Sequence, residues 1–395
     1  GIDMLGMLID TGTIFYRAFR PKTFEFRETK EMTVSAICPV YNEEDTLEDG
    51  IRALICQTIP LLNIYILDDC STDNTETIGI RLQTLYPSMV EYRRMRQNGG
   101  KARNINDLVE NTYNELGDLI FINDGDCIPL PDCIEELKRK FSDKAVVGVT
   151  GYPIVTETGS LVNSLFTKGK KWQINSLHFR KSAQCLRDAM SVLCGAVSLY
   201  DKRILRKQPM PMRTATEDLD HTWMLLEDGY RLEFENIAFT VAPDVGNLKS
   251  QWAQAYRWNK GFWQTFYFHT LDNRLDRSPM LKYTVVYVAF LDFFLLICRF
   301  VLIAAFAITG EVFFLYYIFL EMLLLVIPGI TFYGIKGVIY LPFNYLYQIL
   351  VLITNLCSGY EITRDYLSGN ILKWSNRWKR DYGKRTLVDN SIGLS

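Results

Sequence analysis

The chain has 395 residues and a hydrophobic content of 48%, which is enough for two or three domains and too apolar for a disordered protein. Lys and Arg number 43 against 45 Asp and Glu, so the formal net charge is −2, which argues against a protein whose main task is binding nucleic-acid backbone. Nine cysteines without a CxxC pair and only three histidines argue against a zinc site, and we expect reduced thiols in a cytosolic domain.

The first segment, residues 1–32, contains an apolar stretch from Met4 to Phe19 that Asp10 and Arg17 interrupt. This stretch is too short to span a bilayer. It also lacks the basic region and the cleavage site of a signal peptide. Two alternatives fit it equally well, an amphipathic helix in a membrane interface and a plain soluble helix.

Residues 33–245 alternate short apolar runs with helical stretches. Strands are expected over 34–40, 63–67, 90–95, 118–123, 145–149, 190–200 and 232–242. Helices are expected over 44–57, 101–116, 131–141 and 161–187. Two further helices are expected, one that follows the second strand and ends at about residue 86, and one that begins at Thr216. This order predicts an α/β domain with a doubly wound, mostly parallel sheet, in which ligands lie at the carboxyl ends of the strands.

The C-terminal third is markedly more apolar. Within residues 246–280, the stretch 248–269 is amphipathic and rich in aromatic residues, as expected near a membrane surface. Residues 281–358 contain apolar segments at 283–308, 312–332 and 337–357, which predict two or three membrane helices, the third being borderline. The tail, residues 359–395, is basic, which favours the cytosolic side and an even number of crossings.

Two acidic pairs follow expected strands. Asp124 and Asp126 flank a glycine, and two carboxylates in a tight turn can bind a hard divalent cation that also takes phosphate oxygens. The alternative for this pair is a solvated turn. Asp68 and Asp69 suit a base N–H or a ribose hydroxyl, or alternatively only cap the next helix.

Three further motifs suit a phosphorylated sugar. The Gly-rich loop 98–104 carries Lys101 and Arg103 into a helix, which suits phosphate, although it lacks the spacing of a nucleotide-triphosphatase loop. Thr216-Glu217-Asp218 supplies a third carboxylate group. In the stretch 254–258, Arg257 suits a leaving phosphate and Trp258 suits a sugar face, although each alone is an ordinary surface feature.

Taken together, these motifs resemble glycosyltransferase family two. The resemblance rests on Pro39-Val40-Tyr41-Asn42-Glu43, the DDxSxDxT run from Asp68, the DGD at Asp124, the TED at Thr216 and the QxxRW at Gln254. More narrowly, the chain resembles the membrane-embedded synthases of hyaluronan, chitin, cellulose and poly-N-acetylglucosamine. The resemblance covers roughly residues 33–270 and the C-terminal membrane layout. It implies a GT-A catalytic domain facing the cytosol, in an integral protein of a plasma or inner membrane.

The resemblance also implies roles for individual residues. Binding of the donor nucleotide and its phosphates falls to Tyr41, Glu43, Asp69, Lys101, Asp124 and Arg257. Asp124 and Asp126 would bind Mg or Mn as the cofactor. Asp218 would be the general base, and direct displacement with one base predicts inversion. The acceptor side, including gating, falls to Glu217, Cys194, Gly195, Gln254 and Trp258.

These roles imply a metal-dependent inverting hexosyltransferase that moves a sugar from a UDP-sugar to a growing polysaccharide. The large synthases enclose a polymer channel with more membrane helices than this chain offers. The chain therefore forms a homo-oligomer, has a partner subunit, or adds a single sugar to a polyprenyl-phosphate or glycolipid acceptor. Because no acidic motif is missing, a catalytically dead nucleotide-sugar sensor is disfavoured. A channel or transporter fits poorly because the soluble domain is most of the chain.

Overall fold

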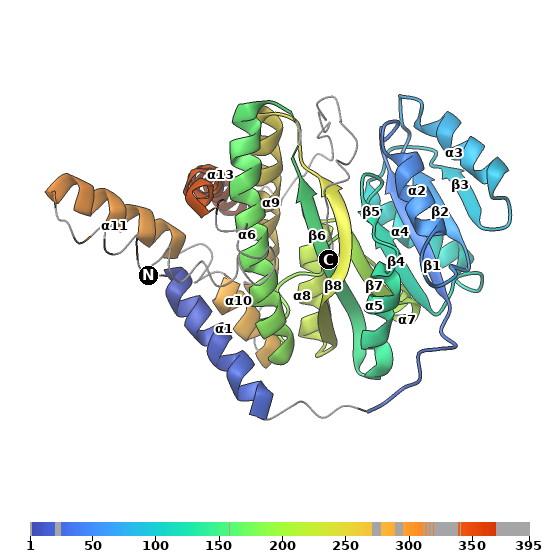
Figure 1. Cartoon of the computed structure of the whole chain (residues 1–395), viewed down its shortest axis with the longest axis horizontal. Helices are drawn as coiled ribbons and strands as arrows, with labels where there is room; N and C mark the ends of the chain where they lie inside the picture. The colour runs from blue at the N-terminus through green and yellow to red at the C-terminus, as the bar shows by residue number, and fades with distance from the viewer. Residues whose placement is uncertain are drawn as a thin grey trace.

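The computed structural model describes residues 2–19, 25–157, 159–270, 278–288, 295–310 and 341–368, with the single residues 313, 316, 319 and 339. Its centre is an eight-stranded sheet in the order β3-β2-β1-β4-β7-β6-β8-β5, with helices on both faces (Figure 1). The strands are β1 (Val34–Val40), β2 (Ile64–Asp68), β3 (Val90–Arg94), β4 (Leu119–Asn123), β5 (Ile128–Pro129), β6 (Val146–Thr156), β7 (Val197–Asp201) and β8 (Arg231–Pro243).

Helices connect these strands and extend beyond them. In chain order they are α1 (Ile2–Phe19), α2 (Leu47–Ile55), α3 (Thr75–Leu85), α4 (Lys101–Thr112), α5 (Cys133–Arg139), α6 (Leu161–Leu186), α7 (Lys202–Lys207), α8 (Glu217–Glu227), α9 (Leu248–Thr270), α10 (Pro279–Tyr287), α11 (Leu295–Thr309) and α13 (Leu341–Leu367). The alternation of strands and helices up to α5 confirms the predicted α/β class.

The sheet is parallel over β3, β2, β1 and β4 and then reverses. β7 runs antiparallel to both β4 and β6, β6 pairs with β8 in parallel, and β5 runs antiparallel to β8. The mostly parallel sheet was predicted, and the reversal at β7 was not. The strand expected over 190–200 begins only at Val197, because the amides of Leu193 and Cys194 donate to the hydroxyls of Thr222 and Thr150 instead of a neighbouring strand.

Strands with both faces buried explain the two halves of the core. Every residue of β4 is buried, as expected for a central strand covered on both sides. Alternate residues face opposite ways: Ile120 and Ile122 join α4, α7 and α8 in one cluster, while Leu119 and Phe121 join α2, α3 and α5 in the other. The carboxyl ends of the central strands are thereby held between two packed layers.

A second layer of helices lies beside the sheet. α6 and α9 run side by side, and α13 packs against both (Figure 1). The approach of α6 to α13 is close at Gly169, where an added Cβ would lie 2.2 Å from the carbonyl oxygen of Phe343. α1 is a helix and is bound to the end of α6 by the ion pair between Asp10 and Arg187, 2.5 Å apart.

The predicted membrane segments are only partly described. The segment 283–308 appears as α10 and α11, with 289–294 outside the described residues. Of the segment 312–332, only residues 313, 316 and 319 are described, and the third segment corresponds to α13. The basic tail beyond residue 368 lies outside the described residues. Across the part of the chain that the structure describes, no helix combines the length and the hydrophobicity needed to cross a bilayer.

The close contact at Gly169 predicts a large effect of one added methyl group. We expect Gly169→Ala to lower the melting temperature, because the backbone oxygen of Phe343 cannot move aside as a flexible side chain could. Gly12→Ala in α1 is the matched control, since nothing lies within 4 Å of its added Cβ. The control should stabilise the helix by about 0.5–1 kcal/mol through helix propensity. Equal melting temperatures for the two variants would contradict the close packing of α6 on α13.

Candidate active site

The carboxyl ends of β1, β2 and β4 meet at one edge of the sheet. In the parallel register, Val40 of β1 lies beside Asp68 of β2, and Ile37 lies beside Ile122 of β4. The predicted site residues that follow these strands are Tyr41 and Glu43 after β1, Asp69 after β2, and Asp124 and Asp126 after β4. Parallel pairing therefore brings together motifs that are far apart in the sequence.

The glycine between the two aspartates is required by packing. A Cβ on Gly125 would lie 2.6 Å from Cγ1 of Val40 and 3.2 Å from Cγ of Glu43. Real Cβ atoms almost never approach other atoms so closely. The glycine therefore lets the turn that carries Asp124 and Asp126 lie directly against the end of β1.

Asp69 positions the Gly-rich loop. Its two carboxylate oxygens accept hydrogen bonds from the backbone amides of Gly99 and Gly100, at 2.8 and 2.9 Å. Gly100 has a φ of +85°, which a glycine adopts without strain. This arrangement sets the start of α4, whose first residue is Lys101. The expected contact of Asp69 with a nucleotide stays a prediction.

Lys101 connects the expected donor side of the site to the expected acceptor loop. Its Nζ lies 2.5 Å from Oδ1 of Asp124 and donates to the carbonyl oxygen of Gly195 at 2.7 Å. Burial alone would lower the pKa of Lys101, but the nearby charges of Asp124 and Glu217 outweigh it and raise the pKa above its usual range. The ammonium therefore stays charged between these groups.

Asp218 is held at the first turn of α8. Its Oδ2 accepts from the amide of Gly195 at 3.1 Å, and its Oδ1 accepts from the amide of Leu219 at 2.9 Å. A Cβ on Gly195 would lie 3.0 Å from Nζ of Lys101 and 3.3 Å from Oδ2 of Asp218, so a larger residue would crowd both groups. Burial, and next the charge of Asp218, raise the pKa of neighbouring Glu217.

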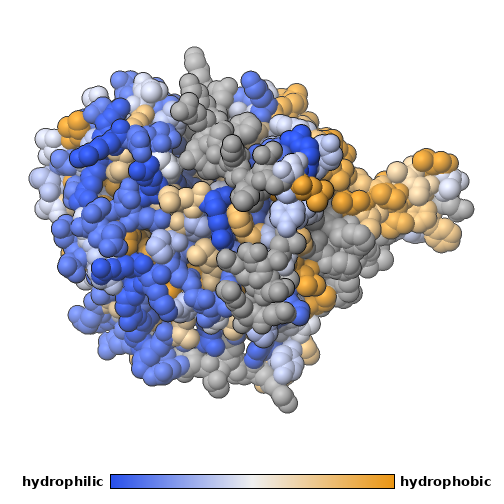
Figure 2. Space-filling model, turned by 180° about the vertical axis from the view of Figure 1, so that it is seen from behind, coloured by the Kyte–Doolittle hydropathy of each residue, from blue (hydrophilic) through white to orange (hydrophobic). Residues whose placement is uncertain are grey.

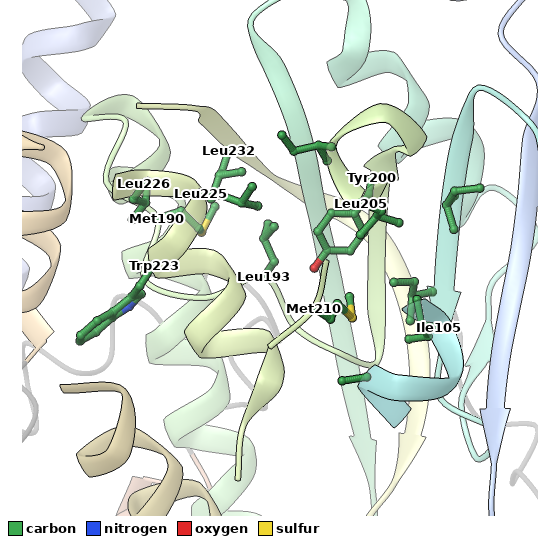
Figure 3. Close-up of a cluster of buried hydrophobic side chains, with 14 of the residues drawn as sticks. Ile105, Met190, Leu193, Tyr200, Leu205, Met210, Trp223, Leu225, Leu226 and Leu232 are labelled. Atoms are coloured by element: carbon green, nitrogen blue, oxygen red, sulfur yellow. The ribbon is translucent and has the colours of Figure 1, made fainter. Parts of the chain in front are cut away.

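A small, narrow pocket lies among these groups. Its lining residues come from α4, the sheet and the start of α8: Lys101, Ile122, Gly195, Ser198, Tyr200, Met210, Glu217 and Asp218. Tyr200 and Met210 belong to the hydrophobic cluster that also holds Trp223, Leu225 and Leu226 of α8 (Figure 3). The charged end of α8 is thus anchored by an apolar core behind it.

The turn after β4 offers ligands for a divalent cation. Ligand atoms of Asp124, Asp126 and Cys127 lie within 4.8 Å of one another. Asp126 is buried, and Asp124 already binds a cationic group, the ammonium of Lys101. Two carboxylates are the oxygen donors that Mg or Mn prefers, so the residues present fit the expected ion.

The three residues of the QxxRW signature on α9, Gln254, Arg257 and Trp258, contact two different parts of the protein. Arg257 donates to the carbonyl oxygen of Ala215 at 3.3 Å, just before the TED motif. Gln254 and Trp258 instead contact Lys170 of α6. In the described part of the chain, neither of these two side chains contacts a carboxylate of the acidic cluster.

Two buried ionic networks were not predicted from the sequence. Lys170 pairs with Asp244, and Asp220 accepts from both Arg213 and His269, with each donor nitrogen 2.8 Å away. A single lysine or aspartate on an expected helix looks like an ordinary solvated charge. For the first network, the signal was the run of polar residues in the helical stretch 161–187, which contains Lys170.

Burial of His221 predicts a pH dependence of folding. Burial lowers its pKa from the usual 6.5 to about 4, so between these values the unfolded chain takes up a proton that the folded chain does not. The free energy of unfolding should therefore fall as the pH drops from 6.5 to 4. We expect His221→Gln to make this fall shallower without abolishing it, because burial also lowers the pKa of His178. Melting temperatures measured at intervals from pH 7 to 4 check this, and parallel curves for variant and parent would contradict it.

Comparison with known proteins agrees with this geometry. Residues 35–208 match the family described as glycosyl transferase family 2. The uncharacterized glycosyltransferase YaiP of Escherichia coli K12 is 25% identical over 239 residues, covering 59% of this chain and 57% of the relative. A poly-beta-1,6-N-acetyl-D-glucosamine synthase of Staphylococcus aureus is 24% identical over 253 residues, covering 64% and 59%. The chain thus spans under two thirds of these relatives' length.

A solved structure with the same fold covers more of the chain. The mannosyltransferase PcManGT from Pyrobaculum calidifontis, solved with GDP-Man and Mn²⁺, matches with a TM-score of 0.61 at 17% identity. The match covers 90% of this chain and 99% of that structure. This likeness confirms a GT-A-like α/β fold.

Proposed function

We propose that this chain, through its glycosyl transferase family 2 domain, transfers a sugar with inversion from a UDP-sugar to a growing polysaccharide. The observation that carries the proposal is one connected cluster. Lys101 bridges Asp124 and the carbonyl of Gly195, and the amide of the same Gly195 donates to Asp218. Gly195 therefore contacts both Lys101, at the candidate phosphate and metal site, and Asp218, the candidate base. Transfer to an acceptor hydroxyl requires such closeness.

Asp218 is the proposed general base. One of its oxygens takes the proton of the acceptor hydroxyl while that hydroxyl oxygen attacks the anomeric carbon and the bond to the diphosphate breaks. The hydrogen bonds that the amides of Gly195 and Leu219 donate hold the carboxylate at the positive end of α8. Base catalysis of this kind contributes about 10²–10⁴-fold.

The cations around the pocket are assigned to the leaving diphosphate. The charges of Lys101 and Arg257 both act on Glu217, where they oppose the rise in pKa that burial causes, and both would oppose the negative charge of the departing phosphates. Asp124 and Asp126 would hold a divalent cation, which supplies further charge stabilisation when bound. The Mn²⁺ and nucleotide sugar of PcManGT support this assignment.

Attachment to a membrane is part of the proposal. The exposed face of α13 carries Leu346, Ile349, Ile353 and Leu356, while its polar residues Asn344, Thr354, Asn355 and Ser358 are buried against the protein. Figure 2 shows hydrophobic side chains gathered on the side of the molecule from which α11 projects. Both features support contact of α11 and α13 with lipid. The proposal extends this contact to the region 281–358 as a whole and assigns the catalytic domain to the cytosolic side.

Release of nucleotide from a panel of UDP-sugars and GDP-mannose, with product sizing, tests this function. We expect Asp218→Asn to lower turnover by about 10²–10⁴-fold, because the amide cannot accept the proton. Nucleotide binding should stay intact. Asp228→Asn, at the other end of α8, is the matched control.

The products separate the alternatives. A ladder or a high-mass product supports a polysaccharide synthase. A single lipid-soluble product that requires a polyprenyl-phosphate or glycolipid acceptor assigns single-sugar transfer instead. No turnover by the parent chain with any donor would contradict the proposal, and near-normal turnover by Asp218→Asn would contradict the assignment of the base.

Metal dependence makes a separate prediction. We expect Asp124→Ala and Asp126→Ala each to lose at least about tenfold in Mn²⁺-dependent UDP affinity, because each removes a carboxylate that holds the ion. Calorimetric titration of UDP with Mn²⁺ or with a chelator measures this directly. Asp107→Ala, an exposed aspartate on α4, is the control. Tight, Mn²⁺-dependent UDP binding by both site variants would overturn the metal assignment.

A further inference from the structure

Lys170 is a buried lysine that contacts two of the three signature residues. It lies in the middle of α6 and is only 3% exposed. Its Nζ donates to Oε1 of Gln254 and lies 5.1 Å from the ring centroid of Trp258. No motif of the sequence includes this lysine, although it lies directly behind the residues expected to meet the acceptor.

A carboxylate at the end of β8 holds Lys170 in place. Oδ1 of Asp244 lies 2.5 Å from Nζ of Lys170, and the exposed fractions of the two side chains are 4% and 0%. The other oxygen of Asp244 accepts from Thr167 and from Gln251, both at 2.6 Å. Burial opposes ionisation of Asp244, but the charge of Lys170 outweighs it and lowers the pKa of the carboxyl group. The ammonium therefore has a charged partner and a single position.

The bond to Gln254 decides which end of its amide is available. An amide has an oxygen that accepts and a nitrogen that donates, on opposite sides of one carbon. Because an ammonium group can only donate, it holds the oxygen of Gln254 toward α6. The nitrogen of Gln254 is then left to donate to a hydroxyl group.

The same ammonium orients the indole of Trp258. A cation near the face of a tryptophan ring is attracted to it, and the attraction strengthens where water is excluded. Trp258 remains 38% exposed, so part of the ring stays accessible for stacking on a sugar. α13 packs against both helices of this network. Its Tyr347 is buried against Ala255 of α9, and its Phe343 contacts Gly169 of α6.

We propose that Lys170 is a positioning residue for the acceptor, which fixes the donating face of Gln254 and the ring of Trp258 toward the incoming sugar. This inference rests on the proposed function, because it requires a sugar acceptor at the signature. It separates the two halves of the site: Lys101 organises the donor side, and Lys170 organises the acceptor side.

Steady-state kinetics of Lys170→Met test the proposal. The donor is the one that the panel identifies, and the acceptor probe is a tetrasaccharide of the same sugar. We expect the KM for the tetrasaccharide to rise at least about tenfold, because Gln254 and Trp258 lose a charged partner. Donor hydrolysis without acceptor, and UDP binding, should stay within about twofold, the range expected for a separate site. Lys171→Met, one residue along α6 with an ion pair to Glu157, is the matched control and should change none of these values.

Further variants separate positioning from folding. Lys170→Met/Asp244→Asn removes both charges, leaves no unpaired buried ion, and should fold while keeping the raised KM. In Gln254→Ala, the additional Lys170→Met change should have less effect on the KM than it has in the parent chain, because Lys170 acts through Gln254. An unchanged KM, an equal loss of donor hydrolysis, or additive effects would each overturn the positioning role. A parent chain that turns over no donor would instead overturn the proposed function, and this inference with it.

Discussion

The site depends on holding several carboxylates together in one small volume. Asp124, Glu217 and Asp218 line or flank one pocket, where like charges repel one another. Burial, and next the charge of Asp218, raise the pKa of Glu217. Lys101 offsets this repulsion because its ammonium is buried among them and bonded directly to Asp124. The Gly-rich loop leads directly into Lys101, and Asp69 holds this loop in position through the amides of Gly99 and Gly100.

The two sides of the site are built from different kinds of structure. The proposed donor side lies at the carboxyl ends of parallel strands, where backbone pairing sets the positions of Asp69 and Asp124. The proposed acceptor residues Gln254 and Trp258 lie on α9 beside α6, where the buried ion pair of Lys170 and Asp244 holds the lysine that contacts them. Changes in helix packing can therefore alter the acceptor side while the nucleotide site at the sheet edge stays the same.

Glycine residues mark the places where this site allows no side chain. Gly125 lies against the end of β1, and Gly195 lies between Lys101 and Asp218. In both cases the neighbouring groups are parts of predicted motifs, so the glycine is needed for two motifs to come into contact. This explains why small residues accompany the acidic residues in the sequence, a relation that spacing alone does not reveal.

Most of the fold was predictable because apolar runs alternate with helical stretches, and a run such as β4 has no other stable place than the centre of a sheet. The ends of helices and strands were less predictable where a backbone amide donates to a side chain and not to another backbone group. α2 begins at Leu47 and not at Glu44, because the amides of Glu43 and Glu44 donate to Thr75 and Asp73. Such long-range side-chain bonds leave no periodic pattern in the sequence.

The sequence by itself indicated the kind of chemistry, since the acidic pairs, the Gly-rich loop and the QxxRW signature stand in an order that resembles one family. The tertiary structure alone decided how these groups are connected. Lys101 reaches Asp124 and Gly195, and Lys170 reaches Asp244 across 74 positions in the chain. The physical reason is that a lysine pairs with whichever buried carboxylate the fold places within its reach. The packing of helices and sheet sets that distance, and no local sequence pattern encodes it.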